Sequence, residues 1–358
     1  MKTIKKHPTI KKKGNDLLLP LLERKLKYYL EKYNTDPTAT RQSHIKTLLF
    51  FSSACFIYFA IIFGYLPISR NVLWILLGLN FACIGFNIMH DAGHNSYSKN
   101  KIINDLLVLS LNLVGGSSYL WRVKHNILHH TYTNVDGHDE DVAAGPMRLH
   151  RNQPLKKWHR YQHIYGLLFY TATYAWWIWY LDYAKYFSGK INGHTFPKMK
   201  FKNHVIFWVS KIFYVGYIVV IPWYFLGFWQ FLLGYSLLLI VCGFFISIIF
   251  QLAHIVEDVD NPLIDEDNEI KEEWCVHQIR TTANFATKNK ILSFFIGGLN
   301  FQIEHHLFPK VNHVHYAKLQ PYIKDACIEK NVKYIENDTF FSAFASHLRR
   351  LKKLGTEA

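Results

Sequence analysis

The sequence predicts an all-α integral membrane protein with four transmembrane helices. Of its 358 residues, 50% are hydrophobic and 19% are charged, against about 25% charged in typical soluble domains. Four long segments carry almost no charge, and a transmembrane helix needs roughly 20 mainly apolar residues. The formal charge of +15 does not indicate a nucleic-acid partner, because the basic residues concentrate in the tails, where a cytoplasmic membrane surface explains them.

The charge distribution divides the chain into three parts. Residues 1–46 carry twelve Lys or Arg against four Asp or Glu and are expected to form a basic cytoplasmic segment with an amphipathic helix at 16–33. Residues 47–320 form the predicted membrane domain. Residues 321–358 form a basic cytoplasmic tail, which we expect to be helical and to lie on the surface.

The four predicted spans pair into two hairpins. They are residues 47–69, 71–89, 204–226 and 229–253. Lys211 is the one charged residue within the third span, and it is expected to reach the near interface with its long side chain. Arg70 is the only Lys or Arg in the two short outside loops, so the positive-inside rule places both termini in the cytoplasm.

Two further apolar stretches are predicted to lie on the cytoplasmic leaflet as interfacial or re-entrant helices. Residues 106–121 are uncharged but short and are interrupted by two glycines and two serines. Residues 161–180 are uncharged and about long enough to span. If either crossed the bilayer alone, the histidine groups described next would face opposite sides.

Seven histidines occur in three groups, each just outside a long apolar segment. The groups are His90 and His94; His125, His129 and His130; and His305 and His306. In a helix, residues four apart share one face, so the first two groups each present a pair of imidazoles in one direction. A lone histidine is more often a hydrogen-bonded surface residue than a ligand. Three groups together predict a metal site.

The types of residue in the predicted site limit which kinds of metal site are possible. Structural zinc sites favour cysteine, and the five cysteines are widely spaced with no CxxC, so neither a zinc finger nor a disulfide framework is expected. Copper electron-transfer sites would pair histidine with cysteine. A haem-binding membrane electron carrier would hold its histidines within apposed spans, and a metal transporter would carry polar residues through them. Histidines at the inner mouth of a bundle leave positions open for oxygen.

The motifs HDAGH (90–94), HNILHH (125–130) and QIEHH (302–306) resemble the three histidine boxes of the integral-membrane fatty acid desaturase family. The glutamine that opens the third motif is similar to the front-end and linoleoyl-CoA desaturase branch. The resemblance covers residues 45–320. It implies a non-haem di-iron enzyme that uses O2 and external electrons to introduce a cis double bond into an acyl chain, carried as acyl-CoA or acyl-lipid.

The resemblance also implies roles for individual residues. The two irons would be bound by His90, His94, His125, His129, His130, His254, His305 and His306. Gln302 would complete the shell or hold a metal-bound water. Residues that would orient the imidazoles from behind are Asp91, Asn134, Asp139 and Asp141. His277 belongs to no motif and is expected at most in this supporting layer.

Two features of the reaction stay open at this point. The sequence contains no HPGG haem motif, so electrons are expected from a separate carrier, either ferredoxin or cytochrome b5. A hydroxylase or a sphingolipid-type desaturase on the same scaffold is the near alternative, since the ligands alone do not fix the product. The acidic segment 257–273 is read as a solvated loop, with docking of the electron carrier as the alternative.

Overall fold

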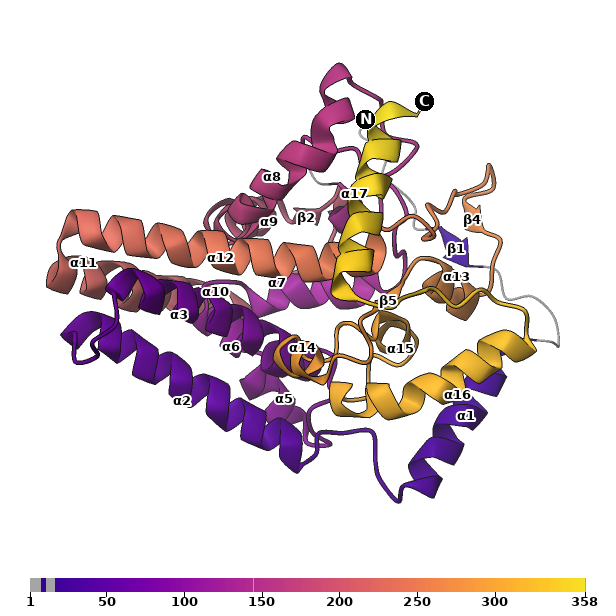
Figure 1. Cartoon of the computed structure of the whole chain (residues 1–358), viewed down its shortest axis with the longest axis horizontal. Coiled ribbons are helices and arrows are strands. Elements are labelled where there is room, and N and C mark those ends of the chain that lie inside the picture. The colour runs from indigo at the N-terminus through magenta and orange to yellow at the C-terminus, as the bar shows by residue number, and fades with distance from the viewer. Residues whose placement is uncertain (1–7, 11–16, 144, 358) are drawn as a thin grey trace.

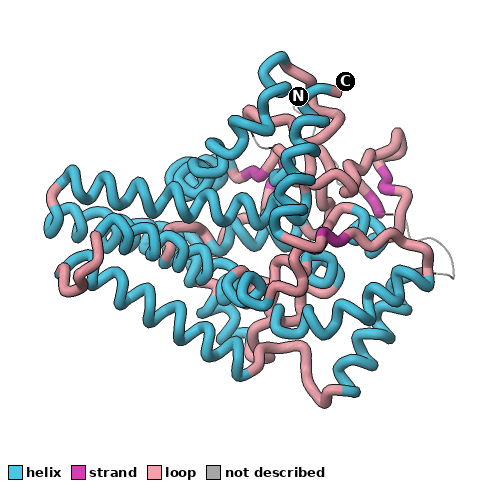
Figure 2. Tube along the Cα trace, in the orientation of Figure 1, coloured by secondary structure: helices cyan, strands magenta, loops and turns pink. Residues whose placement is uncertain are grey.

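The computed structural model describes residues 8–10, 17–143 and 145–357, and these form a mostly helical molecule. Within them, strands occur as three pairs of two residues each (Figure 2). The parallel pairs are β1 (Thr9–Ile10) with β4 (Glu269–Ile270), and β5 (Asn284–Phe285) with β6 (Glu336–Asn337); the antiparallel pair is β2 (Lys190–Ile191) with β3 (His194–Thr195). The predicted helical class is confirmed.

Four helices among the described residues are long and apolar enough to cross a membrane, as predicted. They are α2 (Arg41–Phe63); α3 (Arg70–Ile84) continued by the π-helical turn η1 (Gly85–Met89) and α4 (His90–Gly93); α10 (Phe201–Tyr214) continued by η6 (Val215–Val220) and α11 (Ile221–Leu226); and α12 (Phe228–His254). The first begins and ends about six residues before the predicted span: the Thr40 side chain accepts a hydrogen bond from the Gln42 N–H and starts the helix, and Gly64, with φ 67°, ends it.

Helix α12 lies between α3 and α8 (Gln162–Trp176), and α2 covers the far side of α3 (Figure 1). Glycines allow the close approach: a Cβ at Gly78 would stand 2.7 Å from the Leu238 carbonyl oxygen, and one at Gly243 2.9 Å from that of Thr171. In the apolar 18-residue stretch of each span, 72% of the residues are buried within the protein for the span containing α3, but only 28% for α2. The outer helices therefore leave apolar faces free for lipid.

The two shorter apolar stretches are helical but broken or short. Residues 101–129 form α5 (Lys101–Leu107), α6 (Ser110–Leu113), α7 (Ser118–Arg122) and the π-helical η2 (Val123–His129), with a bend of 113° after α6. This bend fits the predicted re-entrant stretch, although the bent pair counted as one span would give five. The stretch at 161–180 forms α8 and η5 (Trp177–Leu181), followed by α9 (Asp182–Ser188), and is not among the four candidate spans.

The expectation for Lys211 is wrong. Its side chain is 5% exposed and does not reach an interface. The ammonium lies 2.8 Å from an oxygen of buried Asp182 and donates to the carbonyls of Gly115 at 2.6 Å and Ile178 at 3.0 Å. The ion pair offsets the cost of burying the charge, and the bond to Gly115 satisfies a carbonyl left free where the bent segment turns.

Shorter helices gather at one end of the long ones (Figure 1). They are α1 (Leu18–Lys32), η3 (Glu140–Val142), η4 (Lys157–Tyr161), α13 (Trp274–Arg280), α14 (Lys290–Phe295), α15 (Gln302–Leu307), η7 (His313–His315), α16 (Tyr316–Glu329) and α17 (Phe340–Thr356). The α1 helix corresponds to the predicted amphipathic helix, whose expected start at residue 16 lies outside the described residues. The acidic segment 257–273 is tied down by ion pairs, among them Asp260 and Glu272 with Arg280.

Candidate metal centre

Eight histidines converge where the long helices meet the shorter ones. They are His90, His94, His125, His129, His130, His254, His305 and His306. None is more than 7% exposed. The first two follow the π-helical turn at the end of α3, the next three lie on or directly after η2, one ends α12, and the last two lie on α15. Segments up to 216 residues apart in the chain therefore supply a single buried cluster.

The ring nitrogens form overlapping groups in which all candidate ligand atoms lie within 4.8 Å of one another. We call His90, His94, His125 and His305 the tetrad, and His129, His254 and His306 the triad; a third group joins His130 to His305 and His306. The ring centroids of His130 lie 4.7 Å from those of His305 and 4.3 Å from those of His306, so this imidazole stands between tetrad and triad.

The cluster has the properties of a metal site. Several buried ring nitrogens have no hydrogen-bond partner within the described chain, namely Nε2 of His94, His129, His305 and His306. Buried polar atoms without partners are uncommon in folded proteins, and a site for a metal ion is a standard explanation of them. Neutral imidazole suits iron, copper, zinc and nickel, so the residues present fit the metals that the sequence predicted.

Protonation favours the same conclusion. Burial, reinforced by neighbouring histidines, holds the pKa of His94, His130, His305 and His306 well below the ordinary value. These imidazoles are therefore neutral at physiological pH. A neutral ring offers a lone pair to a metal without first losing a proton.

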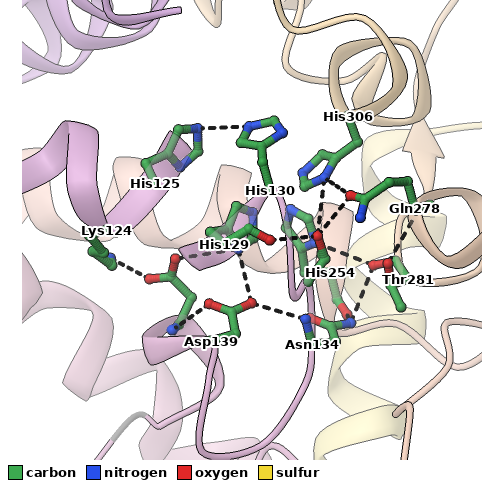
Figure 3. Close-up of polar contacts among 12 residues, drawn as sticks. Lys124, His125, His129, His130, Asn134, Asp139, His254, Gln278, Thr281 and His306 are labelled. Atoms are coloured by element: carbon green, nitrogen blue, oxygen red, sulfur yellow. Dashed lines mark hydrogen bonds and ion pairs between the residues drawn. The ribbon is translucent and has the colours of Figure 1, made fainter. Parts of the chain in front are cut away.

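An acidic pair holds one member of the triad from behind (Figure 3). The Nδ1 of His129 lies 2.9 Å from an oxygen of fully buried Asp139 and 3.6 Å from one of Asp141. Asp141 forms an ion pair with Lys124. A proton on Nδ1 leaves Nε2 as the ligand atom, so the predicted supporting position of Asp139 agrees with the geometry, and Asp141 lies one step further out.

The other two triad histidines are held by acceptors from α13 and the residue that follows it (Figure 3). The Nδ1 of His306 lies 2.8 Å from the side-chain oxygen of Gln278, and that of His254 lies 3.3 Å from the backbone oxygen of Thr281. The Thr133 hydroxyl is 2.9 Å from the same Gln278 oxygen. Each triad imidazole thus meets an oxygen at Nδ1.

Packing, rather than hydrogen bonding, surrounds most of the tetrad. The Trp121 ring stacks on His125 with centroids 4.5 Å apart, and it lies edge-on to His90 and His94 at 5.8 Å each. Gly93 makes room for the indole, because a Cβ there would stand 2.3 Å from the Trp121 ring. The rings of the tetrad are therefore confined by shape.

Two of the predicted supporting residues contact other groups. The Asp91 carboxylate accepts from Nδ1 of His313 at 2.6 Å and from the Asn312 amide at 2.8 Å, and it touches no ring of the eight histidines. It therefore links the end of α3 to the segment before α16. The hydrogen bonds of this carboxylate thus go to Asn312 and His313 and not to a ring of the cluster, so the role of Asp91 in orienting a ligand stays a prediction.

Asn134 acts on backbone instead of on a ring. It has φ 59°, a left-handed conformation that asparagine tolerates well. Its backbone N–H donates to Asp139 at 2.9 Å, and its amide nitrogen donates to the carbonyls of His254 at 2.9 Å and Thr281 at 3.2 Å (Figure 3). The residue therefore joins the second histidine motif to the end of α12.

Gln302 lies beside the triad. Its side-chain nitrogen is 3.0 Å from Nε2 of His254, and its oxygen has no partner in the described chain. The amide therefore lies beside a candidate ligand atom, and its role in holding a metal ion or a metal-bound water stays a prediction. His277 is buried but belongs to none of the histidine groups.

Sequence reasoning missed Gln278, Thr281, Trp121 and Tyr316. The Tyr316 hydroxyl lies 3.2 Å from Nδ1 of His305 and is the counterpart, in the tetrad, of the acceptors around the triad. A backbone carbonyl has no sequence signature, and a glutamine, tyrosine or tryptophan outside a motif carries no metal-binding pattern. Only the fold brings these groups to the histidines.

Comparison with known proteins shows independently which family the chain resembles. The profile of the family described as Fatty acid desaturase matches residues 68–338. The chain is 37% identical over 346 residues to the sn-1 linoleoyl-lipid 6-desaturase of Synechocystis sp., covering 94% of each chain. It is 33% identical over 343 residues to the protein of the same name from Arthrospira platensis, covering 93% of this chain and 91% of that one. The acyl-lipid (8-3)-desaturase of Physcomitrium patens is 37% identical over 79% of this chain and 59% of its own length.

Proposed function

This chain belongs to the fatty acid desaturase family, and we propose that it introduces a cis double bond into the acyl chain of a membrane lipid, using O2 and externally supplied electrons. One observation carries the proposal. Eight buried histidines, contributed by three motifs and the end of α12, meet with unpartnered ring nitrogens directed at one another. No other cluster among the described residues offers as many candidate metal ligands.

We propose that the tetrad holds one iron ion and the triad holds a second, with His130 between them and Gln302 beside the second. Iron bound there would supply the oxidation of an unactivated C–H bond, which acid–base chemistry cannot achieve because the methylene proton is not acidic. The chain's own part is to fix the orientation of the triad imidazoles through Asp139, Gln278 and Thr281, and to exclude bulk water from all eight rings by burial.

The reaction class fixes what must be supplied. Removing two hydrogens from adjacent methylenes and reducing O2 to two waters requires two electrons and two protons from outside. The proposed donor is a separate carrier, either ferredoxin or cytochrome b5.

The proposed topology is the one that the charge distribution predicts. The four candidate spans would form two hairpins, with the short helices as a cap on the cytoplasmic side and both termini there.

The position of the double bond is proposed by analogy. Two relatives that match over more than nine-tenths of both chains are named sn-1 linoleoyl-lipid 6-desaturases. The glutamine that opens the third motif also lies beside the triad. We therefore propose front-end desaturation of an already unsaturated acyl chain carried on a lipid.

Fatty-acid profiling tests this proposal. The protein is expressed in a host supplied with linoleate, and the lipids are analysed for double-bond position and for hydroxyl groups, with His129→Ala as the matched inactive control. A new double bond on the carboxyl side of the existing ones, absent in the control, is the expected result. A hydroxylated product would instead support the hydroxylase alternative, and no iron-dependent product from any supplied lipid would contradict the proposal.

A further inference from the structure

A cavity of about 450 Å³ lies inside the bend of residues 101–129, away from the metal centre. Its walls are the α5–α6 arm, the α7–η2 arm and the first turns of α10, and none of the eight histidines lines it. The volume falls within the range of about 300–1,000 Å³ typical of small-molecule sites. The α7–η2 helix separates it from the metal centre: Arg122 and Asn126 face the cavity, whereas Trp121 and His125 face the histidines.

The cavity wall is strongly basic. Four cationic side chains line it, namely Lys101, Arg122, Lys200 and Lys202, against the single carboxylate of Asp105. That carboxylate already pairs with Lys101 at 2.5 Å and with Arg122 at 2.8 Å. The other two lysines form no ion pair with any residue that the structure describes. Four positive charges against one negative charge leave an excess that an anion would neutralise.

The deep part of the cavity offers hydrogen-bond donors. Ser118 is 6% exposed, and its hydroxyl makes no hydrogen bond to the described chain. The Nε of Arg122 is also buried without a partner, although both terminal nitrogens of the guanidinium are bonded, one to Asp105 and one to the Ala92 carbonyl. Guanidinium and hydroxyl donors beside lysines are the groups that bind phosphate oxygens.

The surroundings indicate that the anion is part of a lipid. The cavity lies at the beginning of a candidate membrane span, Phe201–Leu226, which is the depth at which headgroups meet a bilayer. Exposed apolar side chains flank it on both sides, Ile102 and Leu106 on α5 and Val205 and Val209 on α10, each between 43% and 67% exposed. A soluble anion would gain nothing from these side chains, whereas acyl tails would cover them.

We propose that this cavity binds the phosphate-bearing headgroup of a membrane lipid. The lysines and Arg122 contact the phosphate, and Ser118 contacts it from the wall formed by α7. The tails lie on the apolar faces of α5 and α10. The inference goes beyond the proposed function, because it holds whether or not the bound lipid carries the chain that is desaturated. Lipid binding in the cavity should also influence the metal centre. Arg122 and Asn126 donate hydrogen bonds to the carbonyls of Ala92 and Gly93, which lie between His90 and His94 in the chain.

The test measures binding of short-chain phosphatidylglycerol to the purified full-length protein in neutral detergent by titration calorimetry. In the double variant Lys200→Gln/Lys202→Gln we expect the Kd to rise by about tenfold or more, the loss of one charge-assisted hydrogen bond or more. The matched control is Lys190→Gln/Lys198→Gln, which removes the same charge from the segment just before α10 but from exposed residues that do not line the cavity. Its Kd should stay within about twofold, because exposed charges contribute little.

Two further arms keep the result decisive. Ser118→Leu fills the deep part of the cavity without changing charge and should weaken binding in the same way, with unchanged iron content as the check on folding. Soluble glycerol 3-phosphate should bind at least about tenfold more weakly than the lipid, since it cannot use the apolar flanks. Equal losses in both lysine pairs, or glycerol 3-phosphate binding as tightly as the lipid, would overturn the inference. A failed desaturation assay would leave this binding result standing.

Discussion

The tetrad and the triad hold their imidazoles by different means. In the triad, every Nδ1 meets an oxygen, at 2.8 to 3.3 Å, from Asp139, Gln278 or the Thr281 backbone. In the tetrad, the described chain supplies one such contact, between Tyr316 and His305 at 3.2 Å, and Trp121 confines the remaining rings. The triad should therefore depend on hydrogen-bond chemistry and the tetrad on shape. A ring's tautomer is fixed only where an acceptor selects it.

The largest effect should come from removing one imidazole of either group. His129→Ala in the triad and His305→Ala in the tetrad should each lower product formation by more than about 100-fold, beyond the loss expected from a supporting residue. Iron per protein, measured by elemental analysis, should fall in both. Retained turnover in either variant would show that the group it belongs to is not a metal site.

The next effect separates the groups. Asp139→Asn keeps the size of the side chain but removes the anionic acceptor from His129 Nδ1, so iron affinity should fall by about 10- to 100-fold. The matched control is Asp141→Asn, 3.6 Å from the same nitrogen, which should fall less. An iron titration followed by absorbance measures both. Equal effects would indicate that net charge matters more than the short hydrogen bond.

Gln278 allows a finer test of the triad. Gln278→Leu removes the acceptor for His306 and should reduce iron affinity by about tenfold, whereas Gln278→Glu retains an oxygen there and should recover part of the loss.

Trp121 allows the corresponding test of the tetrad. Trp121→Phe keeps a ring against His125, so it should lower the iron content less than Trp121→Ala does. If the two tryptophan variants lose the same amount of iron, shape does not hold the tetrad.

The smallest effect concerns pH and a residue behind the triad. His347 on α17 is buried, bonds the carbonyl of Ile255 at 2.7 Å and the Tyr170 hydroxyl at 2.9 Å, and burial lowers its pKa to about 4. The unfolded chain therefore binds a proton that the folded chain does not between about pH 6.5 and 4, so this contribution to stability is present above pH 6.5 and is lost as the pH falls toward 4.

That contribution can be isolated. His347→Gln cannot titrate, so its unfolding free energy should decline less steeply between pH 6.5 and 4, by about 1.4 kcal/mol per pH unit in the limiting case. Denaturant unfolding at several pH values measures the slope, with the parent protein as reference. Identical slopes would show that the ring is not kept neutral by its burial.

Apolar composition made three of the four spans predictable to within about four residues, and the first to within about six, because a long uncharged run has few other stable solutions. The start of α2 was missed, since Arg41 and Lys46 resemble solvated residues until Thr40 is seen to cap the helix. Lys211 was misjudged because its partner Asp182 lies 29 residues away in sequence. Seven of the eight histidines were predictable from the three motifs, His254 from its place at the end of the fourth span, and Asp139 from its nearness in sequence to the second motif.

The supporting layer of the metal centre was mostly unpredictable. Gln278 and Thr281 reach the triad only because α13 packs beside α15 through Cys275, Ile279, Ile303 and Leu307, contacts that no metal-binding pattern announces. Asp91 illustrates the opposite case. It lies next to His90 in sequence, yet its carboxylate is committed to His313, more than 200 residues away.

Neighbouring residues serve different groups: His305 faces the tetrad while His306 faces the triad. Two adjacent imidazoles on one short helix cannot be ordered independently, because the backbone that aims one also aims the other. Binding of the first ion would therefore carry the entropic cost of ordering both His305 and His306. The second ion would bind to ligands that are already ordered. Uptake of the pair should accordingly be cooperative, with few molecules holding a single ion at half saturation.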